Sequence, residues 1–372
     1  MKKGWLILLS LGLIATISAQ AMAVDVKFSG EYYVAGLYLD KTSFQKGTAS
    51  EGPSTAFYFQ RLRLNTEFVV APGLTLTLRA DIMERAWGAT RSTPGTTLDT
   101  LSSGTRAENE NIAFDYAYLT YISPIGGFRV GYAPIRYFGT TFGDNTTPAG
   151  SIVYIIQKGG FLGTFTIAQL KEGSKTSILN STGADRDSVE YTLWGLYKWK
   201  GGEAGLLFDY VRDATNRDLG IPSPFAGTGY LSDVFVVNPY AKMQFGPVAM
   251  QAEFGYMFGK ATKWEGPSMG NPDIDMSQWY GMIDGQADLG MFYAGGMIAY
   301  LTGDDPGTPD KMEGGALTGG IDWNPCLILF NNDLNYWAGA QSGYNGAANA
   351  GPMTNAWFFQ VRGGMKPVDK LD

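Results

Sequence analysis

The sequence predicts an all-β fold, a transmembrane antiparallel up-and-down β-barrel of about 16 strands. Three observations predict it: segments that alternate apolar and polar residues, short connections that alternate with long ones, and an unusual composition. Of the 372 residues, 14% are aromatic, 50 are Gly and only 17% are charged. Ordinary soluble domains carry about 25% charged residues. This composition is typical of strands with one apolar face and one polar face.

Residues 1–23 have the features of a cleaved signal peptide. Lys2 and Lys3 precede an apolar stretch, and Ala21-Met22-Ala23 supplies the small residues of a cleavage site. An uncleaved anchor is disfavoured because the stretch is shorter than the roughly 20 residues that span a bilayer as a helix. We expect residues 24–372 to form the barrel. Their 26 basic and 35 acidic residues disfavour nucleic acid as a partner, since phosphate binding needs clustered Lys and Arg.

Strict alternation of side-chain character marks the strands. In the first strand Val26 and Phe28 alternate with Lys27 and Ser29, which places the two sets on opposite faces. Strands that cross hydrocarbon must pair every backbone group, so the sheet is expected to close into a barrel in contact with lipid. The same pattern recurs at 58–70, 74–82, 248–256 and 357–362. Aromatic residues near strand ends are expected in interfacial girdles: Tyr32, Tyr38, Tyr116, Tyr118, Tyr191, Tyr197, Trp199 and Tyr256.

The connections divide into two kinds that alternate along the chain. Short ones rich in Gly and Pro, which suit tight hairpins, lie at 71–73, 123–127, 159–160, 200–202, 246–247, 290 and 324–325. Long polar ones lie at about 41–55, 86–110, 134–150, 173–186, 213–232, 260–276, 303–313 and 337–352. Together they give about 16 strands, an even number as in bacterial barrels.

An 18-stranded barrel that is truncated at its C-terminus is the alternative. Residues 365–372 resemble a turn followed by the start of another strand, rather than a final strand that ends on an aromatic residue. Alternation is also weak over 314–336, where the apolar run 326–330 is continuous.

The chain contains no histidine and one cysteine, Cys326. The missing histidine excludes Ser-His-Asp hydrolysis and His-ligated zinc, and a single cysteine allows no internal disulfide. We expect Cys326 to be a buried or lipid-facing small residue. We therefore predict no enzymatic activity, no cofactor and no metal. The acidic stretch 303–310 is interpreted as a solvated loop because it lacks the ordered ligand spacing of a calcium site.

One long connection carries a motif. After Gly131, the pairs Phe138-Gly139 and Phe142-Gly143 punctuate residues 134–150. In this motif and in strand order the chain resembles general diffusion porins, whose third long loop folds into the barrel and narrows it. The resemblance covers nearly the whole chain at the level of architecture. It implies passive diffusion of small hydrophilic solutes and ions, the outer membrane of a Gram-negative bacterium, a homotrimer, and a constriction that includes Arg136 and Asp144. An ordinary surface loop is the alternative for 134–150.

Porins place basic residues on the wall opposite such a loop, and this chain has candidates on its predicted lumen faces. They are, with their acidic neighbours, Arg61, Arg63, Arg79, Arg129, Asp81 and Asp115. If Val70 pairs with Leu74 across the turn, Arg63 lies opposite Asp81, about 5 Å away. This pair either braces the wall or sets selectivity. Other predicted lumen acids are Glu31, Glu67, Glu190, Glu253, Asp284 and Asp288. From the net charge we hypothesise a mild preference for cations.

Two further functions stay open. The barrel could be a scaffold that docks a periplasmic or extracellular partner, or a substrate-specific channel. Single-channel conductance would separate a pore from a scaffold, because only a pore gives stepwise openings.

Overall fold

The computed structural model describes residues 25–40, 54–88, 112–173, 185–217, 229–265, 271–319, 323, 325 and 351–366. Residues 1–23 and Cys326 lie outside these ranges, so the signal peptide and the environment of the cysteine stay predictions. Most of the long connections predicted at 41–55, 86–110 and 337–352 also lie outside them.

The described secondary structure consists of strands. They are β1 (Asp25–Leu39), β2 (Thr55–Ala71), β3 (Leu74–Ala86), β4 (Ile112–Ser123), β5 (Gly126–Ile135), β6 (Thr147–Lys158), β7 (Phe161–Lys171), β8 (Ser188–Trp199), β9 (Gly202–Asp213), β10 (Tyr230–Phe245), β11 (Val248–Trp264), β12 (Ile274–Asp288), β13 (Phe292–Leu301), β14 (Lys311–Met312), β15 (Leu317–Gly319), β16 (Gly351–Met353) and β17 (Ala356–Met365). No helix in the described part of the chain is long and apolar enough to cross a membrane.

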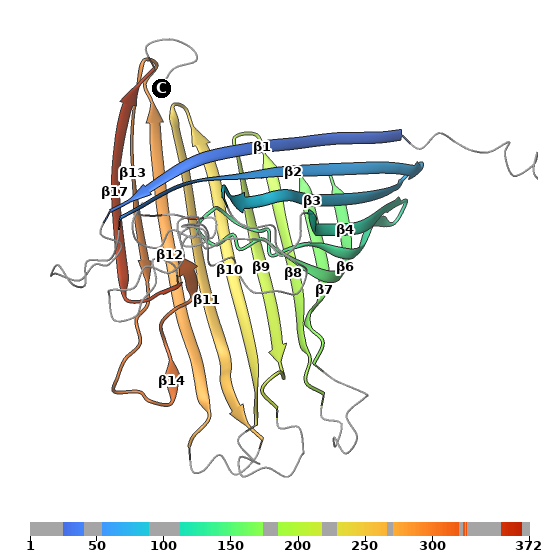
Figure 1. Cartoon of the computed structure of the whole chain (residues 1–372). Helices are drawn as coiled ribbons and strands as arrows, with labels where there is room; N and C mark the ends of the chain where they lie inside the picture. The colour runs from blue at the N-terminus through green and yellow to red at the C-terminus, as the bar shows by residue number, and fades with distance from the viewer. Residues whose placement is uncertain are drawn as a thin grey trace, which may run out of the picture.

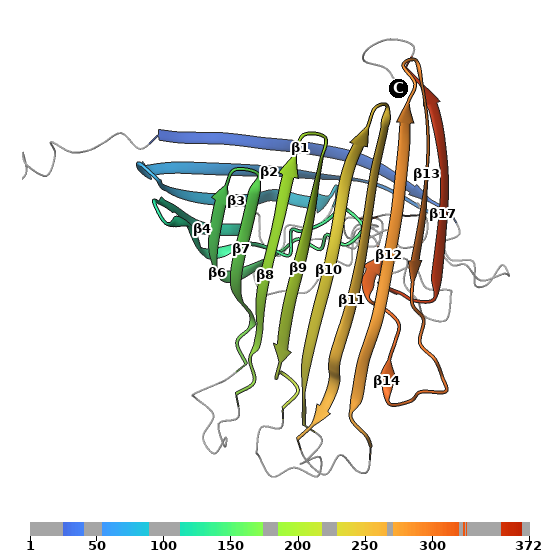
Figure 2. The ribbon, with the colours of Figure 1, turned by 180° about the vertical axis from the view of Figure 1, so that it is seen from behind.

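One large sheet contains most of these strands. Strands β1 to β13 pair in sequence order, β17 follows β13, and every pairing on this path is antiparallel. The short β14 adds a parallel pairing to β12, and β15 pairs with β16 separately. The all-β class and the up-and-down order predicted from the sequence are therefore confirmed. Strands β1 and β17 end the path, and no ladder joins them among the described residues. The sheet curves strongly: β1 to β3 run across the view while β8 to β13 run down it (Figures 1 and 2).

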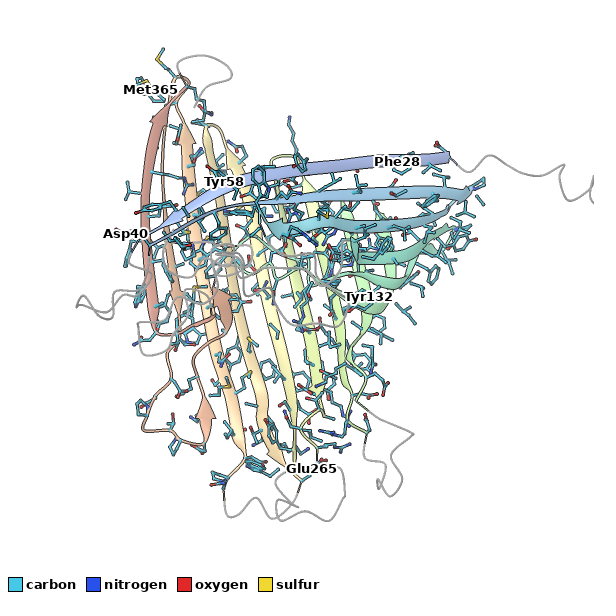
Figure 3. All side chains as sticks on the ribbon, viewed as in Figure 1. Phe28, Asp40, Tyr58, Tyr132, Glu265 and Met365 are labelled. Atoms are coloured by element: carbon cyan, nitrogen blue, oxygen red, sulfur yellow. The ribbon has the colours of Figure 1, made fainter. Side chains whose placement is uncertain are left out.

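The expected alternation of connections agrees with the strand bounds. Six of the seven predicted short connections join consecutive strands, at 72–73, 124–125, 159–160, 200–201, 246–247 and 289–291. The seventh includes Asn324, which lies outside the described residues. Met365, beside the short connections, and Glu265, where a long connection begins, lie at opposite ends of the sheet (Figure 3).

The two faces of the sheet differ in chemistry. On one face large apolar side chains are exposed: Leu193 by 55%, Ile283 by 60% and Phe359 by 72%. On the other face polar groups are buried, with Glu190 exposed by 1% and Glu253 by 3%. We call these the apolar face and the polar face. A soluble sheet buries its apolar face and exposes its polar one, so this arrangement is the inverse.

Stacked aromatic rings form a row across the apolar face, near the strand ends that lead into long connections. Tyr191 of β8 stacks on Tyr210 of β9, which stacks on Phe235 of β10, which stacks on Phe258 of β11. A second group lies near the short connections, where Tyr197 stacks on Trp199. Two aromatic levels that bracket an apolar band are the expected surface of a transmembrane barrel.

Tyr116 and Tyr118 do not belong to this surface, so their predicted place in the girdle is wrong. The ladder between β3 and β4 shifts between Arg79 and Ala80, and this leaves Asp115 as the extra residue of a β-bulge. An extra residue reverses the alternation that follows it. Tyr116 therefore lies on the polar face, with its ring centre 3.7 Å from the Arg79 guanidinium.

Candidate functional site

The connection between β5 and β6, residues 136–146, lies against the polar face of the sheet. The chain leaves β5 through two residues with positive φ, Arg136 (60°) and Gly139 (92°), which turn it back across the wall. Phe138 then packs on Trp194 of β8 and Tyr240 of β10, with ring centres 5.5 and 4.9 Å away. We call residues 136–146 the inner segment.

A second apolar contact fixes the far part of the inner segment. Phe142 packs edge-on against Tyr280 of β12 at 5.6 Å between ring centres, within a buried cluster that also contains Met282, Ala299 and Leu301. All of these side chains are almost fully buried. Burial of a phenylalanine contributes about 1.5–3 kcal/mol, so Phe138 and Phe142 are the apolar anchors of the segment.

Between these anchors the segment is held by the carboxylate of Glu253 in β11. Its Oε2 accepts hydrogen bonds from the Thr140 backbone N–H at 2.7 Å and from Thr140 Oγ1 at 2.5 Å. Its Oε1 accepts one from Asn238 Nδ2 at 2.7 Å. A buried charge is tolerated only when it is paired or fully hydrogen-bonded, and these three donors meet that requirement.

The glycines of the motif fit closely around this carboxylate. A Cβ placed on Gly139 would lie 2.6 Å from Glu253 Oε1, and a Cβ on Gly143 would overlap the same oxygen. The Phe-Gly pairs in the sequence therefore have a physical reason: each phenylalanine is buried and each glycine admits the carboxylate.

Two cations reinforce the segment. Arg136 makes hydrogen bonds to Glu190 Oε2 of β8, with its Nε at 2.8 Å and its Nη2 at 2.6 Å. Burial opposes the charge of Arg136, but the hydrogen bond and attraction to Glu190 prevail and raise the pKa of the guanidinium. Lys242 of β10 donates to the Gly139 carbonyl at 2.8 Å. Arg136 is thus a tether between segment and wall.

Asp144 has a local role in the structure. Its Oδ1 accepts hydrogen bonds from Thr146 N at 3.0 Å and from Thr146 Oγ1 at 2.6 Å. This arrangement is an Asx turn, which shapes the return of the chain into β6.

Three of the four arginines of the predicted ladder, Arg61, Arg63 and Arg79, lie on the polar face of β2 and β3. Arg63 binds Asp81 through two hydrogen bonds of 2.7 and 2.6 Å. Arg79 Nε lies 2.9 Å from Asp115, and Arg63 Nη2 lies 3.5 Å from the same carboxylate. The bulge in β4 brings Asp115 between the two arginines. Arg61 pairs more loosely with Glu84, at 3.6 Å.

The pairing of Arg63 with Asp81 confirms the register expected between β2 and β3. The expected pairing of Val70 with Leu74 is wrong by one residue, because Ala71 pairs with Leu74. A bulge between Val69 and Ala71 absorbs the difference and leaves the rest of the ladder in the expected register.

Arg129 of β5 stands apart from the other arginines. Its guanidinium lies over the rings of Tyr118 and Tyr137, at 5.2 and 5.6 Å from the ring centres. Its Nη1 is 3.4 Å from the Tyr137 hydroxyl, a long hydrogen bond.

The sequence did not identify the residues that hold the inner segment. Glu190 and Glu253 were expected on lumen faces only, and Asn238 and Lys242 were not singled out. Their contacts with the segment join residues that are 54 to 113 positions apart in sequence, so no local pattern could reveal them. Within the described ranges no group of three or more acidic or cysteine side chains is arranged to hold a metal ion.

No protein-family model and no curated protein sequence matches the chain. Several solved structures resemble the structure of this chain, among them the following three. The outer-membrane channel DcaP of Acinetobacter baumannii has 13% identity and a TM-score of 0.46, over 77% of this chain and 81% of DcaP. An anion-selective porin from Comamonas acidovorans has 13% identity and a TM-score of 0.43, over 74% and 79%.

The trimer form of OmpT, an outer-membrane protein of Vibrio cholerae, has 10% identity and a TM-score of 0.33, over 75% of this chain and 89% of OmpT. All three TM-scores are below 0.5.

Substitution of Glu253 by alanine is expected to loosen the inner segment. The change leaves the Thr140 N–H and the Asn238 amide without an acceptor in a buried place, which costs about 1–3 kcal/mol for each group. We expect the Thr140 amide to exchange hydrogen at least about 10-fold faster, since each 1.4 kcal/mol is a factor of ten. Asp284→Ala is the control, because Asp284 pairs with Arg362 and not with the segment. Equal exchange in the two variants would contradict the assigned role.

The pair Arg63–Asp81 is expected to brace the wall asymmetrically. The Asp81 side chain is 5% exposed and that of Arg63 is 25% exposed. Arg63→Gln removes the hydrogen-bonded cation from a buried carboxylate and should cost about 3 kcal/mol. Asp81→Asn should cost only about 1 kcal/mol, because Arg63 keeps Asp115 as a partner. Urea unfolding of protein folded into lipid vesicles measures both values. The reverse order would show that Arg63 does not stabilise Asp81.

Proposed function

We propose that this chain is an outer-membrane porin of a Gram-negative bacterium. In this proposal the sheet closes into a barrel, and small hydrophilic solutes and ions diffuse passively through a water-filled lumen. The inner segment narrows that lumen. The proposal does not include catalysis: Asp81 and Glu253 of the polar face hold Arg63 and the inner segment in place, and the chain has no histidine.

The observation that carries the proposal is the inverted arrangement of the two faces. Side chains such as Leu193, Ile283 and Phe359 are exposed across the wall, and a continuous exposed apolar surface of this kind marks contact with another apolar phase. Hydrocarbon supplies that phase, and it also requires that no strand edge stay unpaired. Closure of the sheet satisfies both conditions, and it turns the polar face inward.

The presence of the inner segment favours a channel rather than a scaffold that docks a partner. A barrel that only docks a partner needs no chain inside it. Here two apolar anchors, a buried carboxylate and Arg136 hold residues 136–146 against the polar face, which the proposed closure turns inward. A rigid obstruction in a wet lumen sets the size and charge of what passes.

Conductance in a planar lipid bilayer tests the proposal directly. The purified full chain in KCl should give stepwise current increases, because each inserted barrel opens one water-filled path. The Glu253→Ala variant should show noisier open currents, since its inner segment is less firmly held. Silence of the wild-type protein, together with a partner that co-purifies in constant ratio, would favour the scaffold instead.

The lipid contact of the apolar face has its own test. Ile283 of β12 lies opposite Ala252, and its neighbour in sequence, Asp284, lies opposite Gln251. Ile283→Arg should destabilise the folded protein in vesicles by about 2–4 kcal/mol, the cost of arginine on the lipid side near mid-membrane. Gln251→Arg introduces the same charge at the same level on the polar face, beside Asp284, and should cost less than about 1 kcal/mol. Equal costs would mean that the apolar face does not contact lipid.

A further inference from the structure

A row of charged side chains crosses the apolar face next to the stacked aromatic rings, on the side of the long connections. Neighbours in a ladder share a face of the sheet, and here the ladders join charges of alternating sign. In order across the strands, the paired residues are Arg212 of β9, Asp233 of β10, Lys260 of β11, Asp275 of β12 and Lys311 of β14. The aromatic rings mark the edge of the apolar band, so this charged row lies at the level of lipid headgroups.

Lys311 is the cation of this row that has no acidic partner. Arg212 lies 2.8 Å from Asp185, and Lys260 lies 2.6 Å from Asp275. Among the residues that the structure describes, no carboxylate oxygen lies within 4.0 Å of the Lys311 ammonium. The Lys311 side chain is exposed. Because Lys260 neutralises Asp275, that carboxylate does not cancel the charge of Lys311.

A groove of about 990 Å³ lies on the same face, over β10 to β13 and β17. Small residues form its floor: Ala252 of β11, Gly281 of β12 and Gly296 of β13. Large exposed side chains such as Ile283 and Phe359 stand around this floor. The groove is therefore a depression in the part of the wall that faces hydrocarbon, and its shape suits a flexible methylene chain.

Aromatic side chains lie between the charged row and the groove. Trp279 of β12 packs on Tyr300 of β13 at 4.8 Å between ring centres, and Tyr300 packs on Trp357 of β17 at 4.3 Å. Trp279 follows Asp275 by four residues, which is about 13 Å of strand. Tryptophan and tyrosine prefer the membrane interface. Lys311, opposite Asp275, is thus placed among headgroups, and the groove begins where acyl chains begin.

We infer that this face binds one membrane lipid, whose phosphate lies at Lys311 and whose acyl chain occupies the groove. A lysine ammonium is a compact charge that binds phosphate without a fixed geometry, which suits a mobile headgroup. The floor at Gly281 and Gly296 lets the chain lie against the backbone, where it gains contacts along its length. This inference rests on the proposed function, because it requires that the apolar face contacts a membrane.

Dimyristoyl phosphatidic acid is the probe, and dimyristoylglycerol has the same chains without the phosphate. Native mass spectrometry of the detergent-purified full chain should show binding of the first and much weaker binding of the second. Lys311→Gln should lower the affinity for phosphatidic acid about 5-fold, the effect of one lysine near a lipid phosphate. Gly281→Leu should also lower it, because the new side chain fills the groove. A Cβ at Gly281 would lie 3.6 Å from Phe254, so the change is accommodated.

Two matched controls separate the site from general effects. Lys198→Gln removes the same charge beside a short connection, where Lys198 lies 3.1 Å from Glu203. Gly285→Leu makes the same change at a β12 glycine outside the groove, where a Cβ would also make only ordinary contacts. Both controls should bind phosphatidic acid as the wild type does. Should Gly281→Leu fail to fold, Lys311→Gln and the comparison of the two lipids decide.

The lipid site is overturned if Lys311→Gln binds phosphatidic acid as tightly as the wild type, or if dimyristoylglycerol binds equally well. Displacement of the lipid by inorganic phosphate, together with no effect of Gly281→Leu, would indicate a site for free phosphate and would also overturn it.

Current recordings separate this inference from the proposed function. Lys311→Gln and Gly281→Leu should leave the single-channel conductance unchanged, because both positions lie on the apolar face and not in the proposed lumen. Stepwise conductance without selective lipid binding overturns the lipid site and leaves the porin. Selective lipid binding by a protein that gives no conductance overturns the porin and leaves the lipid site.

Discussion

The rest of the structure depends on the separation of apolar and polar side chains onto opposite faces of one sheet. A strand has a side-chain period of two, so each strand assigns half of its side chains to each face. Where the apolar half contacts lipid, the charges that the strands carry at that depth must lie on the other face. Acids and bases are thereby concentrated on one surface, and a charge that is removed from bulk water needs a partner. The ion pairs of β2 to β4 and the hydrogen bonds to the inner segment both answer that need.

The inner segment shows how apolar and polar requirements are combined. Phe138 and Phe142 contribute the burial of apolar surface. Glu253 accepts hydrogen bonds from buried donors that have lost their contact with water. Neither part suffices alone. Apolar anchors do not fix the register of a segment, and a buried carboxylate without donors would be too costly. Gly139 and Gly143 make the apolar anchors compatible with the hydrogen bonds to Glu253, because only a residue without a side chain brings the backbone close enough to the carboxylate.

Most of the fold could be predicted from the sequence because it depends on local signals. Alternation, turn glycines and the sorting of connections by length gave the strand order and six short connections in the described region. The bulges could not be predicted, since each depends on how two strands pair. The bulge at Asp115 moved Tyr116 and Tyr118 to the polar face, and the bulge after Val69 shifted the β2–β3 hairpin by one residue. In the site, the Phe-Gly motif lies in the connection that packs on the polar face. Its contacts with Glu190 and Glu253 come from distant strands and left no local sign.

The charge of the polar face is better described by its ion pairs than by the net charge of the chain. The acidic balance of the whole chain suggests a preference for cations, yet a net charge acts over a distance that salt limits to about 10 Å. Asp81 and Asp115 lie directly against Arg63 and Arg79, and a solute close to them meets nearly neutral pairs. Glu190 is likewise engaged by Arg136. Among the described residues Arg129 has no carboxylate partner, so its positive charge dominates its own surroundings even though the chain as a whole is acidic. The net charge of the chain and the local charge at a point on the polar face are therefore different quantities, and a solute close to the wall responds to the local one.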